Sequence, residues 1–244
     1  MHRFYSTPDP GRDDLEWLTP EDSRHALTVL RLKPGDQVEV ISLGRPWLAE
    51  IVGEENRIVC VRKLSSLPST EPNLALTLFQ GLPKADKMDW IVQKATEIGV
   101  SRVIPVVMDR CVVRLSADDA RRKLDRWKKI VREAGKQSGR CVLPEILLPV
   151  TVPQLVCRED LPAVNAVPWE EADGFGPLAL RETFPAPASL GILIGPEGGI
   201  TADEISLLKQ RGFLPMTLGR RILRTETAGL AAAAALLSLY GEME

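Results

Sequence analysis

The stretch LIGPEGGITADE, residues 193–204, joins an apolar run to a helix start through a glycine-rich loop. The run Leu190–Ile194 stops at Gly195, and the loop that follows carries Glu197 in its middle. Thr201–Glu204 has the Thr-x-x-Glu pattern of a capping box, so a helix is predicted to begin there. A strand, a glycine loop and a helix form the unit with which many α/β folds hold a nucleotide, so this stretch predicts both a sheet and a ligand.

The chemistry of this loop argues against a phosphate ligand. A Walker loop needs Lys-Ser/Thr after its glycines, but Ile200 and Thr201 stand there, and no early G-x-G-x-x-G fingerprint is present. Glu197 would also repel phosphate where a helix N-terminus attracts it. A ligand with ribose hydroxyls, an uncharged base and a positive centre, such as S-adenosylmethionine, fits better. A plain tight turn remains the alternative.

The chain around this loop alternates between strand and helix patterns from residue 73 onward. Strands are predicted at 74–79, 102–107, 163–167, 190–194 and 213–218, and helices at 86–99, from about 116–119, at 202–211 and at the C-terminal Ala/Leu run. This alternation predicts an α/β fold with a parallel sheet covered on both faces. The terminal helix is apolar nearly all round, so we expect it in the core or, as we favour, at a subunit interface.

Residues 1–70 follow a different pattern, with short strands predicted at 34–42, 47–52 and 57–64. Turn residues separate these runs, which is typical of a small barrel or sandwich. A helix is predicted at 20–31, and the Ser/Pro-rich stretch 65–73 is interpreted as a linker.

Composition narrows the classes of function. The four cysteines are scattered without a C-x-x-C pair, which predicts neither a metal site nor disulfides. With only two histidines and no nucleophile motif, most Ser-His and Cys-His hydrolases are excluded. No apolar run is long enough to span a bilayer and the N-terminus lacks a signal-peptide core, so we expect a cytoplasmic protein without a membrane partner.

Charge is distributed unevenly along the chain, although its net value is only −2. Residues 84–140 hold fifteen Lys/Arg and eight Asp/Glu, a local balance of +7. A concentrated basic segment in a nearly neutral protein suggests a face for a polyanion. A solvated helix face explains the run at 120–137 as well, and both interpretations stay open.

A second stretch, TLGRRILRTETAGLAAAAAL at 217–236, repeats the strand–loop–helix pattern. Gly219 permits an unusual backbone angle, and the loop after it offers free amides and carbonyls that could bind an adenine edge. Glu226 suits the positive end of the helix dipole. An ordinary capped helix explains Thr225 and Glu226, but not three arginines in one short loop.

Taken together, the motifs resemble those of a known family. LIGPEGG and LGRRILRTETAGLAAAA are similar to two signature motifs of the SPOUT methyltransferases, and specifically of the ribosomal small subunit methyltransferase E family. QGLPKADKMDWIVQKATEIGV at 80–100 and REAGKQSGR at 132–140 resemble two further motifs, and HALTVLRLKPGDQVEV at 25–40 resembles the PUA-like domain. The likeness covers essentially the whole chain. Lys136 departs from it, because an acidic residue is expected there.

The resemblance implies an α/β fold in which a SPOUT-type parallel sheet with a C-terminal trefoil knot follows a small PUA-like β-barrel. The knot is an exception to the rule against threaded chains. The implied domains are 1–70, a PUA-like RNA-binding barrel, and 71–244, a methyltransferase domain with the cofactor site and the dimer interface. The implied activity is S-adenosylmethionine-dependent methylation of N3 of one uridine in 16S rRNA, with the assembled small subunit as substrate and a homodimer as the working form.

The chemistry of this reaction, together with the motifs, predicts roles for individual residues. Arg224 would stabilise charge on the uridine carbonyls, with Lys84 or Lys87 as alternates, and Glu226 is a weaker candidate for the base. The residues expected to bind the cofactor are Ile194, Gly195, Glu197, Gly198, Leu218, Gly219, Ile222, Leu223, Arg224, Thr225 and Ala228. Those expected to contact RNA are Arg3, His25, Arg31, Lys84, Lys87, Arg110, Arg114 and Arg140.

Three other functions compete with this one. A catalytically silent RNA-binding assembly factor could keep the fold, but the intact GPEGG and LRTETA motifs favour an enzyme. An α/β enzyme that uses a phosphorylated nucleotide conflicts with the acidic loop. A methyltransferase acting on another RNA would share both glycine motifs but carry a different N-terminal domain.

Overall fold

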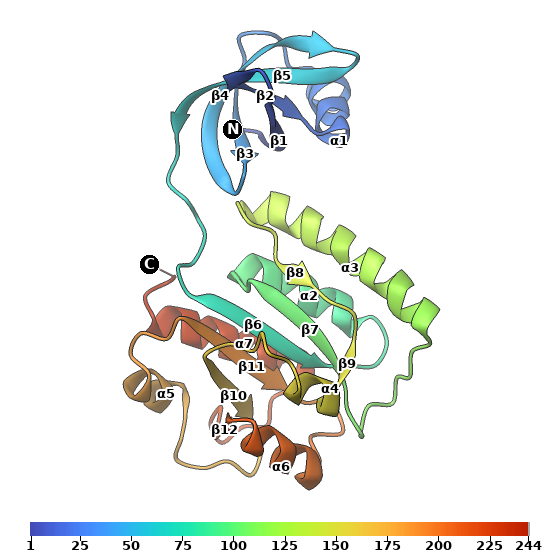
Figure 1. Ribbon diagram of the computed structural model, residues 1–244, viewed down its shortest axis with the longest axis vertical. Helices are drawn as coiled ribbons and strands as arrows, with labels where there is room; N and C mark the ends of the chain where they lie inside the picture. Colours follow the sequence, from blue (N-terminus) through green and yellow to red (C-terminus); the bar gives the residue numbers. More distant parts are fainter. Residues whose placement is uncertain (244) are drawn as a thin grey trace. The chain divides into compact units, whose positions relative to one another are not determined.

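The computed structural model describes residues 1–243 and divides the chain into two compact units (Figure 1). The first unit is Met1–Glu71 together with Gly139–Val142. The second begins at Pro72, runs to Ser138 and resumes at Leu143. The division after Glu71 lies one residue from the predicted boundary, whereas the sequence did not indicate that residues 139–142 would join the barrel.

The first unit is a closed five-stranded barrel with the strand order β1-β2-β5-β4-β3. A parallel pairing of β1 with β3 closes the barrel, and the other pairs are antiparallel. The three predicted strands are present and two further ones were missed. The strands are β1 (Arg3–Asp9), β2 (Arg12–Leu18), β3 (Gln37–Ser42), β4 (Arg45–Glu55) and β5 (Ile58–Ser66).

The predicted helix at 20–31 forms in two parts, α1 (Pro20–Arg24) and a π-helical turn η1 (His25–Val29). Thr19 caps α1 through its side chain, which accepts a hydrogen bond from the amide of Asp22. Proline at the first helical position suits this start, since its missing N–H would be unpaired there anyway. The barrel encloses its own apolar core, which includes Phe4, Val38 and Val61.

The second unit is built on a fully parallel sheet with the strand order β12-β10-β11-β6-β7-β8, and β9 also pairs with β7. The central strands are buried, as expected for a sheet covered on both faces. The predicted α/β fold class, a parallel sheet preceded by a small barrel, is confirmed. The strands are β6 (Ala75–Gly81), β7 (Arg102–Val107), β8 (Glu145–Ile146), β9 (Val150–Thr151), β10 (Val164–Pro168), β11 (Ser189–Ile194) and β12 (Phe213–Met216).

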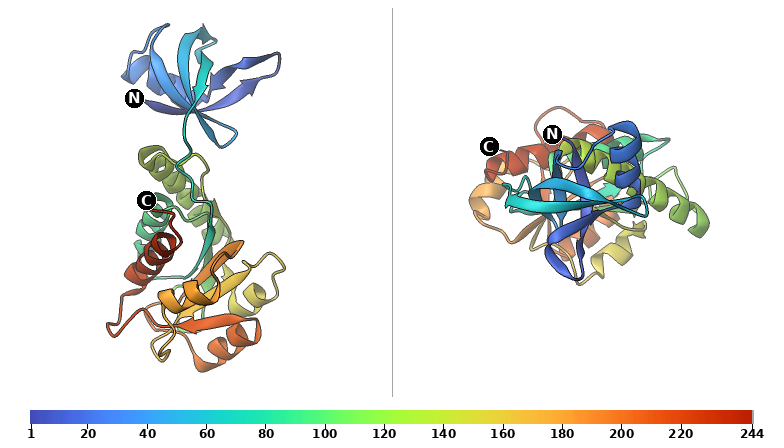
Figure 2. Two further views of the ribbon diagram at one scale, coloured as in Figure 1. Left: turned by 90° about the vertical axis from the view of Figure 1, so that its left-hand side faces the viewer. Right: turned by 90° about the horizontal axis from the view of Figure 1, so that it is seen from above.

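Helices cover both faces of this sheet, with α2 and α7 on one face and α4 and α6 on the other (Figure 2). Gly99 ends α2 with φ +114°, a left-handed angle that glycine adopts readily. Thr201 and Glu204 form the predicted capping box of α6. The helices are α2 (Lys87–Ile98), α3 (Ala117–Ser138), α4 (Val152–Val156), α5 (Pro177–Thr183), α6 (Ala202–Gln210) and α7 (Thr225–Leu239).

The terminal helix α7 packs largely inside its own chain. Leu230, Ala232, Leu236 and Leu237 are buried, and the helix contacts α2, α5, β6 and β11. Its apolar surface is therefore explained in good part by the core, the alternative that the sequence left open beside an interface. No helix within residues 1–243 is both long and apolar enough to cross a membrane.

Candidate functional site

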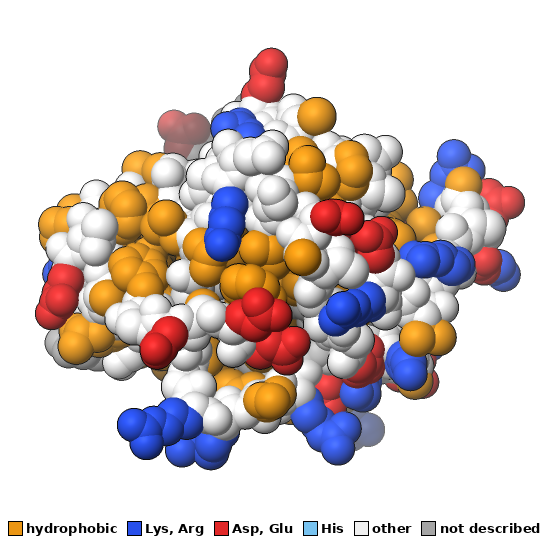
Figure 3. Space-filling model, turned by 90° about the horizontal axis from the view of Figure 1, so that it is seen from below, with side chains coloured by type: hydrophobic (Ala, Val, Ile, Leu, Met, Phe, Trp, Pro, Cys, Tyr) orange, Lys and Arg blue, Asp and Glu red, His pale blue; other side chains and the backbone are white. Residues whose placement is uncertain are grey.

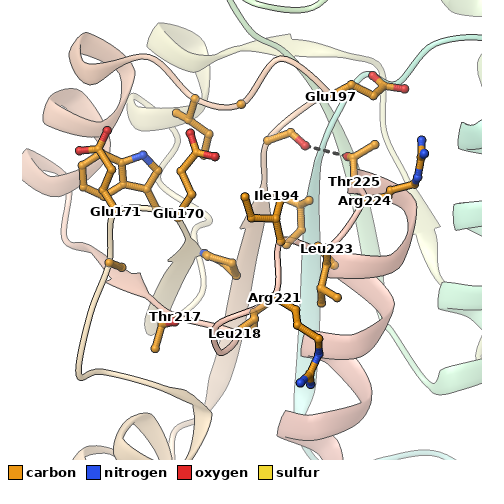
Figure 4. Close-up of a pocket in the computed structure, with 18 of the residues that line it drawn as sticks. Glu170, Glu171, Ile194, Glu197, Thr217, Leu218, Arg221, Leu223, Arg224 and Thr225 are labelled. Carbon is orange, nitrogen blue, oxygen red and sulfur yellow. Dashed lines mark hydrogen bonds between the residues drawn. The ribbon is translucent and has the colours of Figure 1, made fainter.

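A cavity of about 850 Å³ lies where three loops leave the carboxyl ends of β10, β11 and β12 (Figure 4). The carboxyl edge of a parallel sheet is where α/β folds generally bind ligands. The size falls within the range of small-molecule sites. All eleven residues that the sequence predicted for the cofactor line this cavity: Ile194, Gly195, Glu197, Gly198, Leu218, Gly219, Ile222, Leu223, Arg224, Thr225 and Ala228.

The sequence did not predict that the loop after β10 forms one wall of the cavity. The loop after β10 contributes Trp169, Glu170, Glu171 and Asp173. Glu170 and Glu171 lie across the cavity from Leu223 and Arg224 (Figure 4). The position of this loop, directly after a parallel strand, is the signal that could have identified it. It brings exposed carboxylates to a cavity whose opposite loop carries three arginines.

The glycines of the β11–α6 loop are required by close packing. A Cβ on Gly195 would lie 2.7 Å from Ile200 Cγ1, and one on Gly198 would lie 2.8 Å from Arg110 Cβ. On the facing strand, a Cβ on Gly81 would lie 2.6 Å from the nitrogen of Pro196. These glycines let neighbouring backbones approach each other, which differs from the phosphate cradle that a glycine loop usually suggests.

The carboxylate of Glu197 is occupied by contacts within the protein. Its Oε1 accepts a hydrogen bond of 3.2 Å from the backbone amide of Lys84 and one of 3.0 Å from Lys87 Nζ. The same ammonium donates to Glu226 Oε2 at 3.1 Å. We expected Glu197 to face a ligand and to help exclude phosphate. Glu197 does line the cavity, and its carboxylate also ties the loop to the start of α2.

The titration of these three groups reflects their pairing. Bonds to Glu197 and then Glu226 raise the pKa of Lys87 above its usual value. Partial burial opposes ionisation of Glu197, but hydrogen bonds from its own backbone amide and from Lys87 outweigh it and hold the pKa of this carboxyl below its usual value. For Glu226, a hydrogen bond from the Glu226 backbone amide is the main reason that the pKa of the carboxyl is lowered, and the bond from Lys87 adds to the effect. The cluster is therefore ionised at neutral pH.

A second, uncharged tie runs beneath the cavity. Thr225 Oγ1 donates a 2.7 Å hydrogen bond to the carbonyl of Gly195, drawn as the dashed line in Figure 4. The same oxygen accepts a 2.9 Å bond from Nε2 of Gln80, which is completely buried at the end of β6. The first turn of α7 is thus joined to the β11–α6 loop in two ways. The neutral tie is the hydrogen-bond chain from Gln80 through Thr225 to Gly195. The charged tie is the pair of salt bridges from Lys87 to Glu197 and Glu226.

Arg224 occupies the N-cap position of α7. Its carbonyl accepts bonds of 2.8 Å from the amides of Thr227 and Ala228, which fixes its backbone. Its side chain is exposed, and within residues 1–243 the guanidinium makes no hydrogen bond or ion pair, although its charge helps to lower the pKa of Glu226. Among the described residues no carboxylate pairs directly with this guanidinium, so its charge remains open to a substrate.

Glu226 does not support its predicted role as a base. Its side chain is not among the residues that line the cavity, and its carboxylate is bound to Lys87. The lowered pKa makes it a poorer proton acceptor still. We therefore withdraw Glu226 as the base. Lys87 is likewise a poor alternate to Arg224, because its ammonium is engaged by two carboxylates.

Four residues predicted to contact RNA surround the β11–α6 loop or the loop beside it. Arg110 donates 3.0 Å to the carbonyl of Gly198, and Arg114 donates 3.3 Å to the carbonyls of Met108 and Asp109. Lys84 and Lys87 lie on the other side, near Glu197. Lys84, Arg110 and Arg114 are exposed, so their charges remain available to a polyanion.

The three predicted RNA contacts of the barrel differ in their exposure. His25 and Arg31 are exposed, and the His25 ring meets Phe4 edge to face with centroids 6.5 Å apart. Arg3 is mostly covered, because it pairs with Glu39 and packs against Gly139. His25 and Arg31 therefore suit an RNA contact better than Arg3 does.

Arg140 corrects the sequence-based prediction. It is 4% exposed, and its Nε and Nη2 donate to Glu71 at 2.9 and 2.8 Å. Glu71 also accepts bonds from the amides of Cys141 and Val142 at 2.6 and 3.1 Å. A buried, paired guanidinium cannot reach a phosphate, so Arg140 anchors residues 139–142 to the barrel unit and does not contact RNA.

Two further observations concern the charge on one face of the molecule and metal binding. Seen from below in Figure 3, apolar side chains near the centre of the face are bordered by acidic and basic ones, so this face is not uniformly basic. Among residues 1–243 no group of three or more His, Cys, Asp or Glu side chains is arranged to hold a metal ion.

Comparison with known proteins agrees with this geometry. The RNA methyltransferase domain model matches residues 70–237, and the RNA methyltransferase PUA domain model matches residues 18–64. The chain is 34% identical to ribosomal RNA small subunit methyltransferase E of Bacillus subtilis strain 168, over 90% of this chain and 88% of that protein. It is 31% identical to the Mycobacterium bovis protein of the same name, over 96% and 90% of the two chains.

A solved structure shares the whole architecture. The crystal structure of ribosomal RNA small subunit methyltransferase E from Neisseria gonorrhoeae, bound to S-adenosyl methionine, superposes with a TM-score of 0.80. The two sequences are 33% identical, and the match covers 98% of each chain.

Proposed function

The chain belongs to the ribosomal RNA small subunit methyltransferase E family, and from this premise we propose that it transfers the methyl group of S-adenosylmethionine to N3 of a uridine in 16S rRNA. The transfer of a methyl group to ribosomal RNA follows from the family. The uridine N3 position and the 16S site are the finer part of the proposal, and they come from the motif resemblance.

The observation that carries the proposal is the composition of the cavity. Residues of the two glycine motifs form two of its walls, and the loop after β10 forms the third. The left-handed backbone at Gly219, with φ +96°, turns the β12–α7 loop along the edge of the cavity. Exposed carboxylates at Glu170 and Glu171 suit a ligand with a positive centre. A cavity of this size, apolar surface and charge fits S-adenosylmethionine, which when bound supplies an activated methyl group.

The protein contributes position and charge to this reaction. A uridine imide nitrogen becomes a good nucleophile only when its proton leaves, and negative charge then spreads to the two carbonyl oxygens. Arg224 stands at the cavity with a free guanidinium, so we assign to it the stabilisation of that charge. The loops hold the reacting groups in line, and such positioning supplies a large part of the rate in a two-substrate reaction.

RNA would be bound by exposed basic and polar side chains on both units. In the barrel these are His25 and Arg31, and in the second unit Lys84, Arg110 and Arg114. A uridine in structured RNA must be turned out of its stack to expose N3, so these contacts would hold the flanking backbone. We propose the assembled small subunit as the substrate, because the resemblance implies it.

We also infer that the working form is a homodimer in the cytoplasm. Trp90 on α2 and Leu239 on α7 are 45% and 37% exposed, and these two helices pack against each other. Apolar side chains of this size on neighbouring helices suit a second subunit. Light scattering coupled to size-exclusion chromatography distinguishes a dimer from a monomer.

The experiment that tests the function is methylation of small ribosomal subunits from a strain that lacks this protein. We expect purified protein with S-adenosylmethionine to convert one uridine in 16S rRNA to 3-methyluridine, located by mass spectrometry of nuclease fragments. Methylation of a different base or of another RNA would refute the finer assignment. Binding of small subunits without any methyl transfer would favour the catalytically silent assembly factor instead.

A further inference from the structure

We propose that Gln80 and Lys87 are positioning residues for methyl transfer, which together hold the first turn of α7 against the β11–α6 loop and so fix the backbone that carries Arg224. The inference rests on the proposed function, since it takes Arg224 to act on the substrate. The sequence predicts Lys87 as an RNA contact or as an alternate to Arg224, and it predicts no role for Gln80.

The neutral tie depends on Gln80. Its amide nitrogen donates to Thr225 Oγ1 at 2.9 Å and to the carbonyl of Gly81 at 3.1 Å. The Thr225 hydroxyl donates its only proton to the carbonyl of Gly195, so its oxygen can act only as an acceptor toward other groups. The Gln80 amide supplies the donor for that oxygen. The oxygen of the Gln80 amide is buried and has no hydrogen-bond partner within residues 1–243. A buried polar atom without a partner is unfavourable for stability, so the amide serves the position of Thr225 at some cost to the fold.

The charged tie depends on Lys87, the first residue of α2. Its ammonium lies 3.0 Å from Glu197 on the β11–α6 loop and 3.1 Å from Glu226 on the first turn of α7. The three side chains are 21 to 30% exposed, and partly exposed ion pairs contribute little to stability. What this lysine supplies is a connection between two walls of the cavity from a third element.

Both ties end on Thr225 and Glu226, the two residues that follow Arg224. Since the Arg224 carbonyl is bonded to the amides of Thr227 and Ala228, its backbone moves with this turn of the helix. Within residues 1–243 the guanidinium makes no hydrogen bond or ion pair that would fix it. Its position relative to the substrate therefore depends on the turn, and a displacement of about 1 Å in a reacting geometry can cost about 10²-fold in rate.

The charged tie is tested with Lys87→Met, which keeps the length of the side chain and removes the charge. The matched control is Lys94→Met, since Lys94 lies on the same helix and pairs at 2.8 Å with Glu97, away from the cavity. We expect Lys87→Met to lower the single-turnover methylation rate at saturating S-adenosylmethionine by about 10- to 100-fold. Lys87→Arg should restore most of the rate, and Lys94→Met should leave it unchanged.

The neutral tie is tested with Gln80→Met, and Asn165→Leu is the control. Asn165 is also a buried amide in the same sheet, and its oxygen has no hydrogen-bond partner among the described residues. Its nitrogen donates to the carbonyl of Pro162, just before the start of β10, at the end of this strand that is away from the cavity. We expect Gln80→Met to lower the rate within the same range while circular dichroism and the melting temperature show a folded protein. Asn165→Leu should change the melting temperature about as much as Gln80→Met does, but it should leave the methylation rate unchanged. If Gln80→Met does not fold, the Lys87 pair of variants decides.

Equilibrium binding separates positioning from ligand binding and from RNA contact. Calorimetry with S-adenosylmethionine should give dissociation constants within about threefold of wild type for Lys87→Met, and its affinity for small subunits should be unchanged. Loss of subunit affinity with an unchanged rate at saturation would overturn the proposal and return Lys87 to RNA binding. Wild-type rates in both Lys87→Met and Gln80→Met would also overturn it, although the proposed function would stand. An inactive wild type would instead remove the function and the positioning role together.

Discussion

Glu71 and Glu197 are used in parallel ways in the two units, and the contrast between them separates stability from function. Each carboxylate accepts a hydrogen bond from a basic side chain of a distant segment, and from the backbone of that segment as well: Glu71 from two amides and Glu197 from one. Glu71 fastens residues 139–142 in the barrel unit, whereas Glu197 fastens the β6–α2 region to the β11–α6 loop at the cavity.

The two sites differ in burial and in what lies beside them. The Arg140 and Glu71 side chains are 5% and 15% exposed, whereas Lys87 and Glu197 are 30% and 25% exposed. When one partner of a buried pair is removed, the remaining charge is shielded from water. When one partner of a partly exposed pair is removed, water can hydrate the remaining charge. We therefore expect the first cluster to matter for the stability of the fold and the second for the geometry of the cavity.

The largest effect should follow from Glu71→Ala. This change removes the carboxylate that binds the buried Arg140 guanidinium and the amides of Cys141 and Val142, and removal of one partner of a buried pair costs about 3–5 kcal/mol. Urea unfolding of the full chain should show this loss. The control is Asp14→Ala, which breaks an exposed pair with Arg62 in the same unit, and it should cost no more than about 1 kcal/mol. Equal losses in the two variants would remove the distinction drawn from burial.

The next effect should be on the reaction. Arg224→Ala removes the one guanidinium that we assign to charge stabilisation, and loss of such a donor costs about 10²–10³ in rate. Single-turnover methylation at saturating S-adenosylmethionine should fall by that factor, with little change in cofactor affinity or melting temperature. Arg224→Lys, which keeps the charge but not the planar fork, should lie between alanine and wild type. An unchanged rate in the alanine variant would end this assignment.

A smaller effect should appear in the dependence of stability on pH. Because the pKa of Glu226 is lowered in the folded protein, its stabilising contribution is complete above the ordinary glutamate pKa of about 4.3 and is lost as the pH falls through the folded value. Glu226→Gln should therefore be less stable than wild type near pH 7, and the difference should shrink as the pH falls below about 4. Urea unfolding across this range measures the difference, and a constant gap would contradict the ion-pair role.

The smallest effect should be on RNA affinity. Lys84→Ala removes an exposed ammonium but keeps the backbone amide that binds Glu197. If this ammonium meets a phosphate, affinity for small subunits should fall moderately, and the slope of log affinity against log salt should decrease by about one unit. Lys94→Ala, away from the cavity, is the control. Equal slopes for Lys84→Ala and wild type would exclude the phosphate contact.

Local patterns in the sequence predicted much of this molecule. The capping box at Thr201 and the end of α2 at Gly99 were both identified, because their signals lie within a few residues of each other. The eleven residues predicted to bind the cofactor line one cavity, although they were chosen from the motif resemblance and not from spacing, and their contact with the cofactor stays a prediction. The strands β1 and β2 were missed, since their segments RFYSTPD and RDDLEWL lack a clear apolar alternation and β1 includes a proline.

What the sequence could not give depends on contacts between distant residues. Arg140 looked like an RNA contact because the motif around it is basic, yet Glu71 lies 69 positions away in the chain and buries it. The bond between Glu197 and Lys87, which lies 110 positions away, was likewise not predicted, although Glu197 does line the cavity. The loop after β10 carries no recognised motif, and it reaches the cavity only because β10 lies between β11 and β12 in the sheet.

The central claim is that the cavity between these three loops holds S-adenosylmethionine, and isothermal calorimetry tests it most directly. We predict saturable binding of one molecule per chain to the wild type. Ala228→Leu, which adds three carbons to the cavity lining, should abolish it, while Ala117→Leu on the exposed first turn of α3 should bind as wild type does. No binding to the wild type, or equal binding to a folded Ala228→Leu variant, would contradict the account.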